Sequence, residues 1–446
     1  MKPYISIIFT TLLLASCSLL EEPVEECPTS REPEEIKISF RMLTPASDVT
    51  SRADDQGHEE VESEYRRFED GIDLHDLGMF VFAKMANSTE NEKLLLKVVD
   101  LGRAQDVNDH MQIIGTPGSY TVNLTFKKEE FDNFIGQELT TEGTENIQFR
   151  LLLVANSSTA GTTGGLNSAK WSAVRGQDYP TVISQMNDWT YTMAYLCNFN
   201  LEYAEHVMEP GKSVTDFYPN TRQCMPMFGT TTALVSQRSL CNSSDVSRAY
   251  LGDMYMLRSL AKIRLIDNIA NKNADGYPKV ISVDVVGTQH DIHVLPYDAV
   301  NYINGNQVHT PYLANPEYET GNLNKFTYSL GIIPPSWTDV PTQNRKGDVF
   351  VGYLPEMSIL SLPGQTEEGL PAYRINVALS KSADGTELTR DYVVPMNQYQ
   401  DNVFDFGDYI LRNHIYTLSI NRVNLEELTF NVAVNEWRTI DYEYEY

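Results

Sequence analysis

Two pairs of residues have types and spacings that could perform chemistry. His290 and His293 lie close together in QHDIH and could contribute to a metal site, and Ser259 and Lys262 match the S-x-x-K pair of acylating enzymes. The histidines have no third cluster of ligands, and on a strand or turn their two rings would not face one ion. The S-x-x-K pair requires a helix, whereas MLRSLAKIRLID alternates as a strand does. Neither pair therefore predicts a site.

Other catalytic and cofactor-binding motifs are missing from the sequence. It contains no G-x-S-x-G, no phosphate-binding P-loop and no dinucleotide fingerprint. The 61 Asp and Glu residues make any single carboxylate pair uninformative, and the net charge of −27 would repel nucleic acids and anionic membrane surfaces. We therefore expect a protein that is not an enzyme, with no catalytic residue, cofactor or metal.

Cys17 lies in a sequence context that indicates a covalent modification. Lys2 precedes an apolar stretch from Tyr4 to Leu14, which is shorter than the about 20 residues that span a bilayer as a helix. The stretch ends in LASC, which resembles the lipobox of bacterial lipoproteins. Residues 1–17 are therefore predicted to be a signal peptide with a lipidated Cys17, followed by an acidic, proline-rich and extended leash.

The other four cysteines allow three disulfide pairings. Cys224 and Cys241 flank a predicted hairpin and are the most plausible bridge. Buried thiols that act as small apolar side chains fit the sequence equally well. The four are Cys27, Cys197, Cys224 and Cys241.

Alternation of apolar and polar residues is the main structural signal along the chain. It begins with residues 36–42, where Ile36, Ile38, Phe40 and Met42 share one face, and recurs in many short segments. One short helix is expected within YPTVISQMNDWTY. Many strands with few helices predict an all-β protein of tandem β-sandwiches, with the junction in the polar segment CNSSDVSRAYLGD.

A long polar loop and the end of the chain have no evident partner in this pattern. The loop from Thr44 to about Gly71 contains Arg52, and loops of that length inside a domain are often functional. The chain ends in two alternating segments, 428–434 and 440–446. Terminal residues fray unless they are paired, so these segments need a sheet, either their own or that of another chain.

Several segments, spread over most of the chain, resemble the fimbrillins in the order in which that family has them. Fimbrillins are the shaft, tip, accessory and anchor subunits of protease-assembled (type V) pili. The segments are PMFGTTT at 226–232, Arg258 with AKI at 261–263, YLPE at 353–356, DYVVPM at 391–396, LRNHIYTLSI at 411–420 and the isolated Trp437.

The resemblance implies two tandem transthyretin-like β-sandwiches with a few short helices, made as a lipoprotein precursor. It also implies that an arginine-specific protease cuts the loop after the first strand, and that the C-terminal arm of another subunit fills the groove so opened. The implied divisions are a signal peptide 1–17, a propeptide 18–52, sandwiches 53–245 and 246–427, and a donor arm 428–446.

Within this scheme individual residues have expected roles. Arg52 is the expected cleavage site because it lies in the middle of the loop between small residues, whereas Arg66 and Arg67 are close to the next strand. The removable strand would bury Ile36, Ile38 and Phe40, and the donor arm would offer Phe430, Val432, Val434 and Trp437.

The implied function is that of a structural subunit of a fimbria that supports adhesion. Its partners would be other pilin subunits, the arginine-specific protease and, through lipid on Cys17, the outer membrane. The precursor would lie at the cell surface before it enters the fimbria. A surface glycan-binding lipoprotein, with its four tryptophans as sugar platforms, is the alternative function, and an ordinary last strand of its own sandwich is the alternative reading of residues 428–446.

The lipobox makes a direct prediction. The Cys17→Ala variant should not incorporate a fatty-acid analogue during growth, because it has no thiol to receive the lipid. The measurement is in-gel detection of the analogue, with Cys27→Ala as the matched control that keeps its label. Unchanged labelling of the Cys17→Ala variant would contradict the lipobox.

Overall fold

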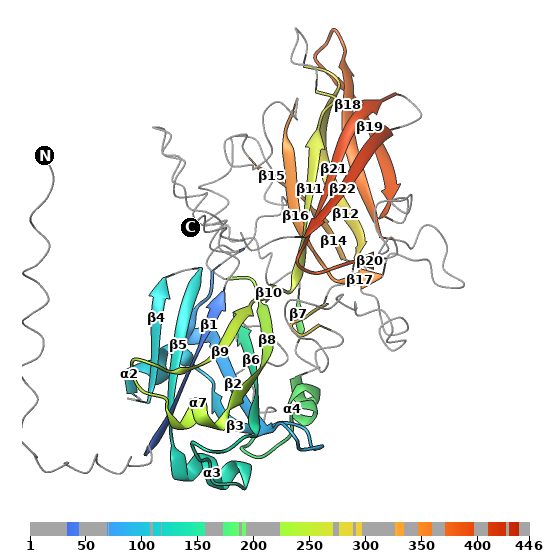
Figure 1. Cartoon of the computed structure of the whole chain (residues 1–446). Helices are drawn as coiled ribbons and strands as arrows, with labels where there is room; N and C mark the ends of the chain where they lie inside the picture. Colours follow the sequence, from blue (N-terminus) through green and yellow to red (C-terminus); the bar gives the residue numbers. More distant parts are fainter. Residues whose placement is uncertain are drawn as a thin grey trace, which may run out of the picture.

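The chain is all-β, as predicted. The computed structural model describes residues 34–43, 69, 71–107, 110–116, 118–156, 173–186, 190–192, 224–270, 276–288, 291–296, 326–333, 347–358, 371–396, 409–424 and 428–436. Most of these residues lie in strands, which build two β-sandwiches of two sheets each (Figure 1). None of the described helices has the length and apolar character to cross a bilayer.

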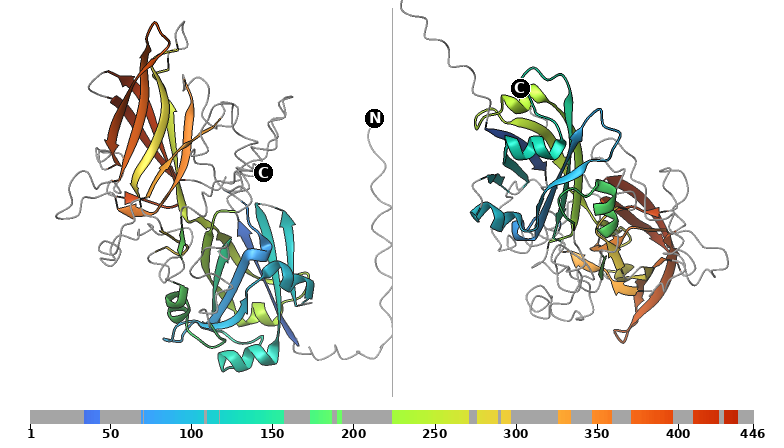
Figure 2. Two further views of the ribbon diagram at one scale, coloured as in Figure 1. Left: turned by 180° about the vertical axis from the view of Figure 1, so that it is seen from behind. Right: turned by 90° about the horizontal axis from the view of Figure 1, so that it is seen from below.

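The first sandwich packs a four-stranded sheet, in the order β4-β5-β1-β9, against a five-stranded sheet, in the order β10-β8-β6-β2-β3. Short helices lie at its ends and on one outer face (Figure 2). Its elements are β1 (Glu35–Leu43), η1 (Leu74–Asp76), β2 (Leu77–Met85), β3 (Lys93–Val98), α2 (Leu101–Val107), β4 (Met111–Thr116), β5 (Ser119–Lys127), α3 (Lys128–Ile135), β6 (Asn146–Ala155), α4 (Tyr179–Met186), β8 (Met227–Ser236), α7 (Gln237–Cys241), β9 (Ala249–Tyr255) and β10 (Leu257–Arg258).

The second sandwich packs a sheet of order β15-β16-β11-β21-β22 against one of order β14-β12-β18-β19. Three segments of the resemblance, AKI, YLPE and LRNHIYTLSI, lie on or directly beside the ends of the adjacent strands β11, β16 and β21. The elements are β11 (Leu260–Asp267), β12 (Lys279–Thr288), β14 (Phe326–Ser329), β15 (Gly331–Ile333), β16 (Val349–Pro355), β18 (Ala372–Lys381), β19 (Glu387–Pro395), β21 (His414–Val423) and β22 (Leu428–Glu436), with the small pairs β7 (Thr190–Thr192) and β13 (Asp291–His293), and β17 (Met357–Ser358) and β20 (Tyr409–Ile410).

The chain passes from one sandwich to the other at Ser259, later than the sequence indicated. Strands β9 and β10 belong to the first sandwich, and β11 begins the second. The predicted boundary at 245/246 therefore precedes two strands of the first sandwich. The polar segment that suggested it connects α7 to β9, and a surface turn has the same polar composition as a linker.

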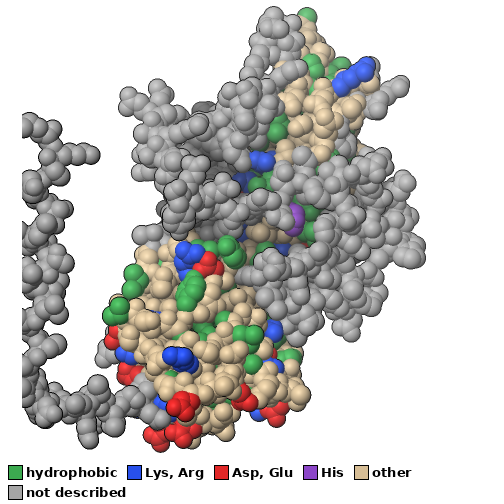
Figure 3. Space-filling model, in the orientation of Figure 1, with side chains coloured by type: hydrophobic (Ala, Val, Ile, Leu, Met, Phe, Trp, Pro, Cys, Tyr) green, Lys and Arg blue, Asp and Glu red, His purple; other side chains and the backbone are tan. Residues whose placement is uncertain are grey.

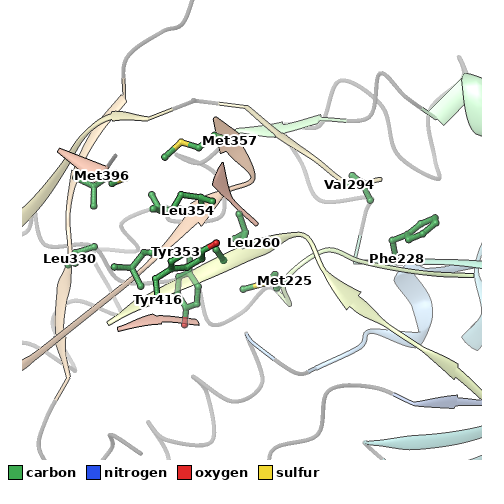
Figure 4. Close-up of a cluster of buried hydrophobic side chains, with 14 of the residues drawn as sticks. Met225, Phe228, Leu260, Val294, Leu330, Tyr353, Leu354, Met357, Met396 and Tyr416 are labelled. Carbon is green, nitrogen blue, oxygen red and sulfur yellow. The ribbon is translucent and has the colours of Figure 1, made fainter. Parts of the chain in front are cut away.

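One sheet of the first sandwich is buried on both faces. Met79 and Val81 of β2 point into the core between the sheets, and Phe80 and Phe82 point to the other side, where α4 covers them. Tyr179 of α4 packs edge-on against Phe82, with ring centroids 5.1 Å apart. This outer layer is continuous with the core of the second sandwich through residues such as Met225, Phe228 and Leu260 (Figure 4). Burial on both faces explains why LGMFVFAKM does not alternate.

Cys224 and Cys241 are both buried and are not joined to each other. The expectation of a bridge between them is wrong, because the segment between them contains one strand rather than a hairpin. Strand β8 spans ten residues, or about 30 Å at about 3.3 Å per residue. A disulfide requires Cα atoms within about 7 Å, so cysteines beyond opposite ends of such a strand cannot pair.

A buried ion pair joins the segment that follows β16 to the segment that precedes β21. Arg412 and Glu356 are 1% and 5% exposed, and Arg412 Nε lies 2.9 Å from Glu356 Oε2. The guanidinium also donates to the backbone carbonyls of His293, Val294 and Leu295 at 2.8–3.1 Å. Two segments of the resemblance, YLPE and LRNHIYTLSI, therefore meet through this pair.

This network should be costly to break. Arg412→Met should lower the free energy of unfolding by about 3–5 kcal/mol, because it leaves the Glu356 carboxylate buried without its cation. Urea denaturation measures the loss. Arg374→Met is the matched control, since Arg374 lies on the exposed face of β18 and its loss should change stability by only about 0.5 kcal/mol. Equal effects of the two variants would contradict the role of the pair.

Candidate strand-exchange site

Strand β1 lies in the interior of its sheet. It pairs in antiparallel fashion with β5 from Glu35 opposite Lys127 to Leu43 opposite Ser119, and in parallel with β9 from Ile38 opposite Ala249 to Leu43 opposite Tyr255. Both neighbours come from parts of the chain far from residues 35–43. Strand β1 is therefore held only by long-range pairing, and its removal would leave two facing strand edges without partners.

The core face of β1 is completely buried. Ile36, Ile38, Phe40 and Met42 are each 0% exposed and belong to the core of the first sandwich. Full burial of each such side chain contributes roughly 1.5–3 kcal/mol. A space vacated by β1 would be an apolar trench with four pockets at alternate positions.

The opposite face of β1 carries cations that pair with carboxylates. Lys37 Nζ lies 2.9 Å from Asp245 Oδ1 and 3.2 Å from Glu35 Oε2. Arg41 donates from Nε to Asp253 Oδ1 at 3.0 Å and also pairs with Oδ2 of the same carboxylate. Burial alone would raise the pKa of Asp253, but hydrogen bonds from Arg41 and from the Tyr250 hydroxyl bring this pKa below its ordinary value.

Strand β22 occupies a different kind of position. Among the described strands, it lies at the edge of its sheet and pairs with β21 alone, from His414 opposite Glu436 to Val423 opposite Leu428. Leu428 and Val432 are partly buried against the core of the second sandwich. The first half of the predicted arm 428–446 is thus an edge strand of its own sandwich, and the boundary at 427/428 does not begin a separate arm.

The structure places the predicted site residues unevenly. Ile36, Ile38 and Phe40 lie on β1 in the first sandwich, and Phe430, Val432 and Val434 lie on β22 in the second, so the two sets are in different sheets. Cys17, Arg52 and Trp437 lie outside the described residues.

Lys262 and His293, which were considered for chemistry, both lie on strands. Lys262 lies on β11, as the strand prediction required, with Nζ 2.7 Å from Glu69 Oε1. His293 is buried on β13, and His290 lies outside the described residues, as do all four tryptophans. No group of three or more His, Cys, Asp or Glu within the described ranges is arranged to hold a metal ion.

Glu69 is a residue that sequence reasoning missed. It lies at the far end of the loop that follows β1, it is 8% exposed, and its carboxylate contacts Lys262 Nζ and the hydroxyl of Tyr353. Its backbone carbonyl accepts from Arg258 Nε at 3.0 Å, and Arg258 also donates to Asn413 Oδ1. The loop end is therefore fixed to the second sandwich. Because the sequence contains 61 Asp and Glu residues, nothing in it singled out Glu69.

Asn156 fixes the following residues to the first sandwich. It has the left-handed backbone conformation, φ 59°, and is 2% exposed. Its Oδ1 accepts from the amide of Asp73, and its Nδ2 donates to the carbonyls of Gly71 and Met225, at 2.7–3.0 Å. Glu69 and residues 71–76 are thus anchored at two places, so the start of β2 is held independently of the loop that precedes it.

Comparison with protein-family models and with curated proteins gives no match. Among solved structures, the chain is similar to the tip fimbrial protein Mfa3 from Porphyromonas gingivalis, with a TM-score of 0.41 and 12% identity over 90% of this chain and 100% of that one. It is also similar to a fimbrial assembly protein from Parabacteroides distasonis, with a TM-score of 0.40 and 10% identity over 90% and 99% of the two chains. A cell adhesion protein from Bacteroides eggerthii gives a TM-score of 0.37 and 11% identity over 91% and 97%.

The two strands should differ in what they contribute to stability. Ile38→Ala should lower the free energy of unfolding of the uncut protein by about 2–5 kcal/mol, because it empties a fully buried pocket. Leu428→Ala removes a side chain of the same size from the half-buried edge strand and should cost about 1 kcal/mol. Urea denaturation compares them. A larger loss of unfolding free energy for Leu428→Ala than for Ile38→Ala would contradict the assignment of β1 as the more deeply buried strand.

Proposed function

We propose that this protein is a structural subunit of a cell-surface fimbria that polymerises by protease-triggered strand exchange. The precursor reaches the outer membrane with lipid on Cys17, and cleavage after Arg52 separates the subunit from both the lipid and strand β1. A strand of another subunit then fills the vacated groove. The assembled fimbria supports adhesion.

The observation that carries this proposal is the position of β1. A strand from the start of the chain lies in the interior of a sheet, paired on both edges and with a fully buried core face. Its loss would expose backbone donors and acceptors on β5 and β9 together with the apolar trench. An extended segment can bind such a groove by backbone pairing, with alternate side chains in the pockets.

Two C-terminal segments are candidates for the donor strand. If residues 428–436 donate, β22 must separate from β21, which an edge strand with half-buried side chains does more easily than an interior strand. If residues 440–446 donate, β22 keeps its place and the alternating Ile440, Tyr442, Tyr444 and Tyr446 reach the neighbouring subunit. The second form leaves the core of the second sandwich intact, and we favour it for that reason.

The preference for Arg52 gains support from the anchoring of Glu69. A protease binds several extended residues on both sides of the bond that it cuts. Arg67 is only two residues from the buried Glu69, whereas Arg52 is far from any anchor in the sequence. Arg41 lies within β1 and is paired with Asp253. Cleavage at Arg52 therefore requires the least unfolding.

Arg52→Ala should abolish maturation. Treatment of the wild-type precursor with an arginine-specific protease should give a new N-terminus at Ala53, whereas the variant should keep its propeptide. Intact mass spectrometry and gel electrophoresis measure the two outcomes. The double variant Arg66→Ala/Arg67→Ala is the matched control and should mature normally. An unchanged mature N-terminus in Arg52→Ala would contradict this site.

A further inference from the structure

The rim of the groove has a charge pattern that restricts which strand can fill it. On one side, β5 places the neutral residues Thr121 and Thr125 opposite Arg41 and Lys37. On the other side lie Asp253 of β9 and Asp245 of the turn before it. The outward face of β1 therefore supplies two cations to an acidic rim, and a replacement strand would meet the same rim. Figure 3 shows charged side chains of both signs on the described face of the first sandwich.

The two rim carboxylates depend on β1 to different extents. Asp245 also pairs with Arg248, whose Nη2 lies 2.9 Å from Asp245 Oδ1, and Arg248 stays when β1 leaves. The side chain of Asp245 is also 72% exposed, so water screens it. Asp253 is 27% exposed, and the cation that it contacts is Arg41 of β1. The position that faces Asp253 is therefore the more selective of the two.

The C-terminal segments of this chain supply no cation at these positions. When Leu428, Phe430, Val432 and Val434 take the four pockets, the outward positions of Lys37 and Arg41 receive Thr429 and Ala433. When Ile440, Tyr442, Tyr444 and Tyr446 take them, the same positions receive Asp441 and Glu445. Reversal of the strand direction exchanges the members of each pair and leaves the charges as they are.

We propose that the groove of this subunit accepts a strand from a different protein, one that places Arg or Lys opposite Asp253, and that it discriminates against the acidic tail of a second copy. This inference rests on the proposed strand exchange and names the chemistry of the partner. A tail with Asp441, Glu443 and Glu445 would put like charges beside Asp253 and Asp245, which is a common way for an interface to exclude a wrong partner. The chain then assembles in alternation with, or next to, another kind of subunit.

The test uses the protein cut after Arg52 and separated from its β1 fragment, together with labelled ten-residue peptides. The native β1 peptide, residues 34–43, should bind to the groove, and the Arg41→Glu peptide should bind roughly tenfold more weakly at low ionic strength. The Lys37→Glu peptide is the matched control and should bind about threefold more weakly or less, because Arg248 offsets Asp245. The tail peptide, residues 437–446, should bind worse than its Asp441→Lys/Glu445→Lys form.

A charge swap separates electrostatic selection from damage to the peptide. The precursor with Arg41→Glu and Asp253→Arg keeps an ion pair, and its processed form should prefer the Arg41→Glu peptide over the native one. The differences should shrink at about 1 M salt, where the screening length is about 3 Å. Equal binding of native and Arg41→Glu peptides would overturn the inference and leave strand exchange standing. Failure of the native peptide to bind would overturn the groove itself.

Discussion

The first sandwich depends on one constraint, that the interior of a β-sheet cannot lack a strand. Strand β1 satisfies the facing edges of β5 and β9 and fills four core positions with Ile36, Ile38, Phe40 and Met42. An unpaired backbone group in such a place costs about as much as a lost hydrogen bond, and empty pockets cost more. A sheet built around a strand from the start of the chain therefore has to keep that strand or obtain another.

The two ends of the described chain contribute in opposite ways. Strand β1 is paired on both edges and its core face is fully buried, whereas β22 is paired on one edge among the described strands, with Leu428 and Val432 only partly buried. Loss of β1 would therefore uncover more apolar area than loss of β22.

Buried polar residues fix how the two sandwiches and the segments between them meet. Glu69 joins the end of the loop that follows β1 to Lys262 and Tyr353 of the second sandwich, and Asn156 holds the next residues against the first. The Glu356–Arg412 pair connects the YLPE turn to the last pair of strands. Buried polar groups need partners of definite geometry, so these contacts fix how the segments meet, which apolar packing alone does less strictly.

The sequence by itself determined the strands and the faces that they bury. Alternation placed Ile36, Ile38 and Phe40 on one face of β1, showed that the S-x-x-K segment is a strand, and located α4, because local periodicity records which side of an element meets water. Only the tertiary structure decided which strands are neighbours. It put β1 in the interior and β22 at an edge, moved the junction to Ser259, separated Cys224 from Cys241, and brought Asp253 to Arg41. Such pairings join residues far apart in the chain. Alternation shows which face of a strand is buried and so limits its register to steps of two residues, but it does not say which distant strands are neighbours.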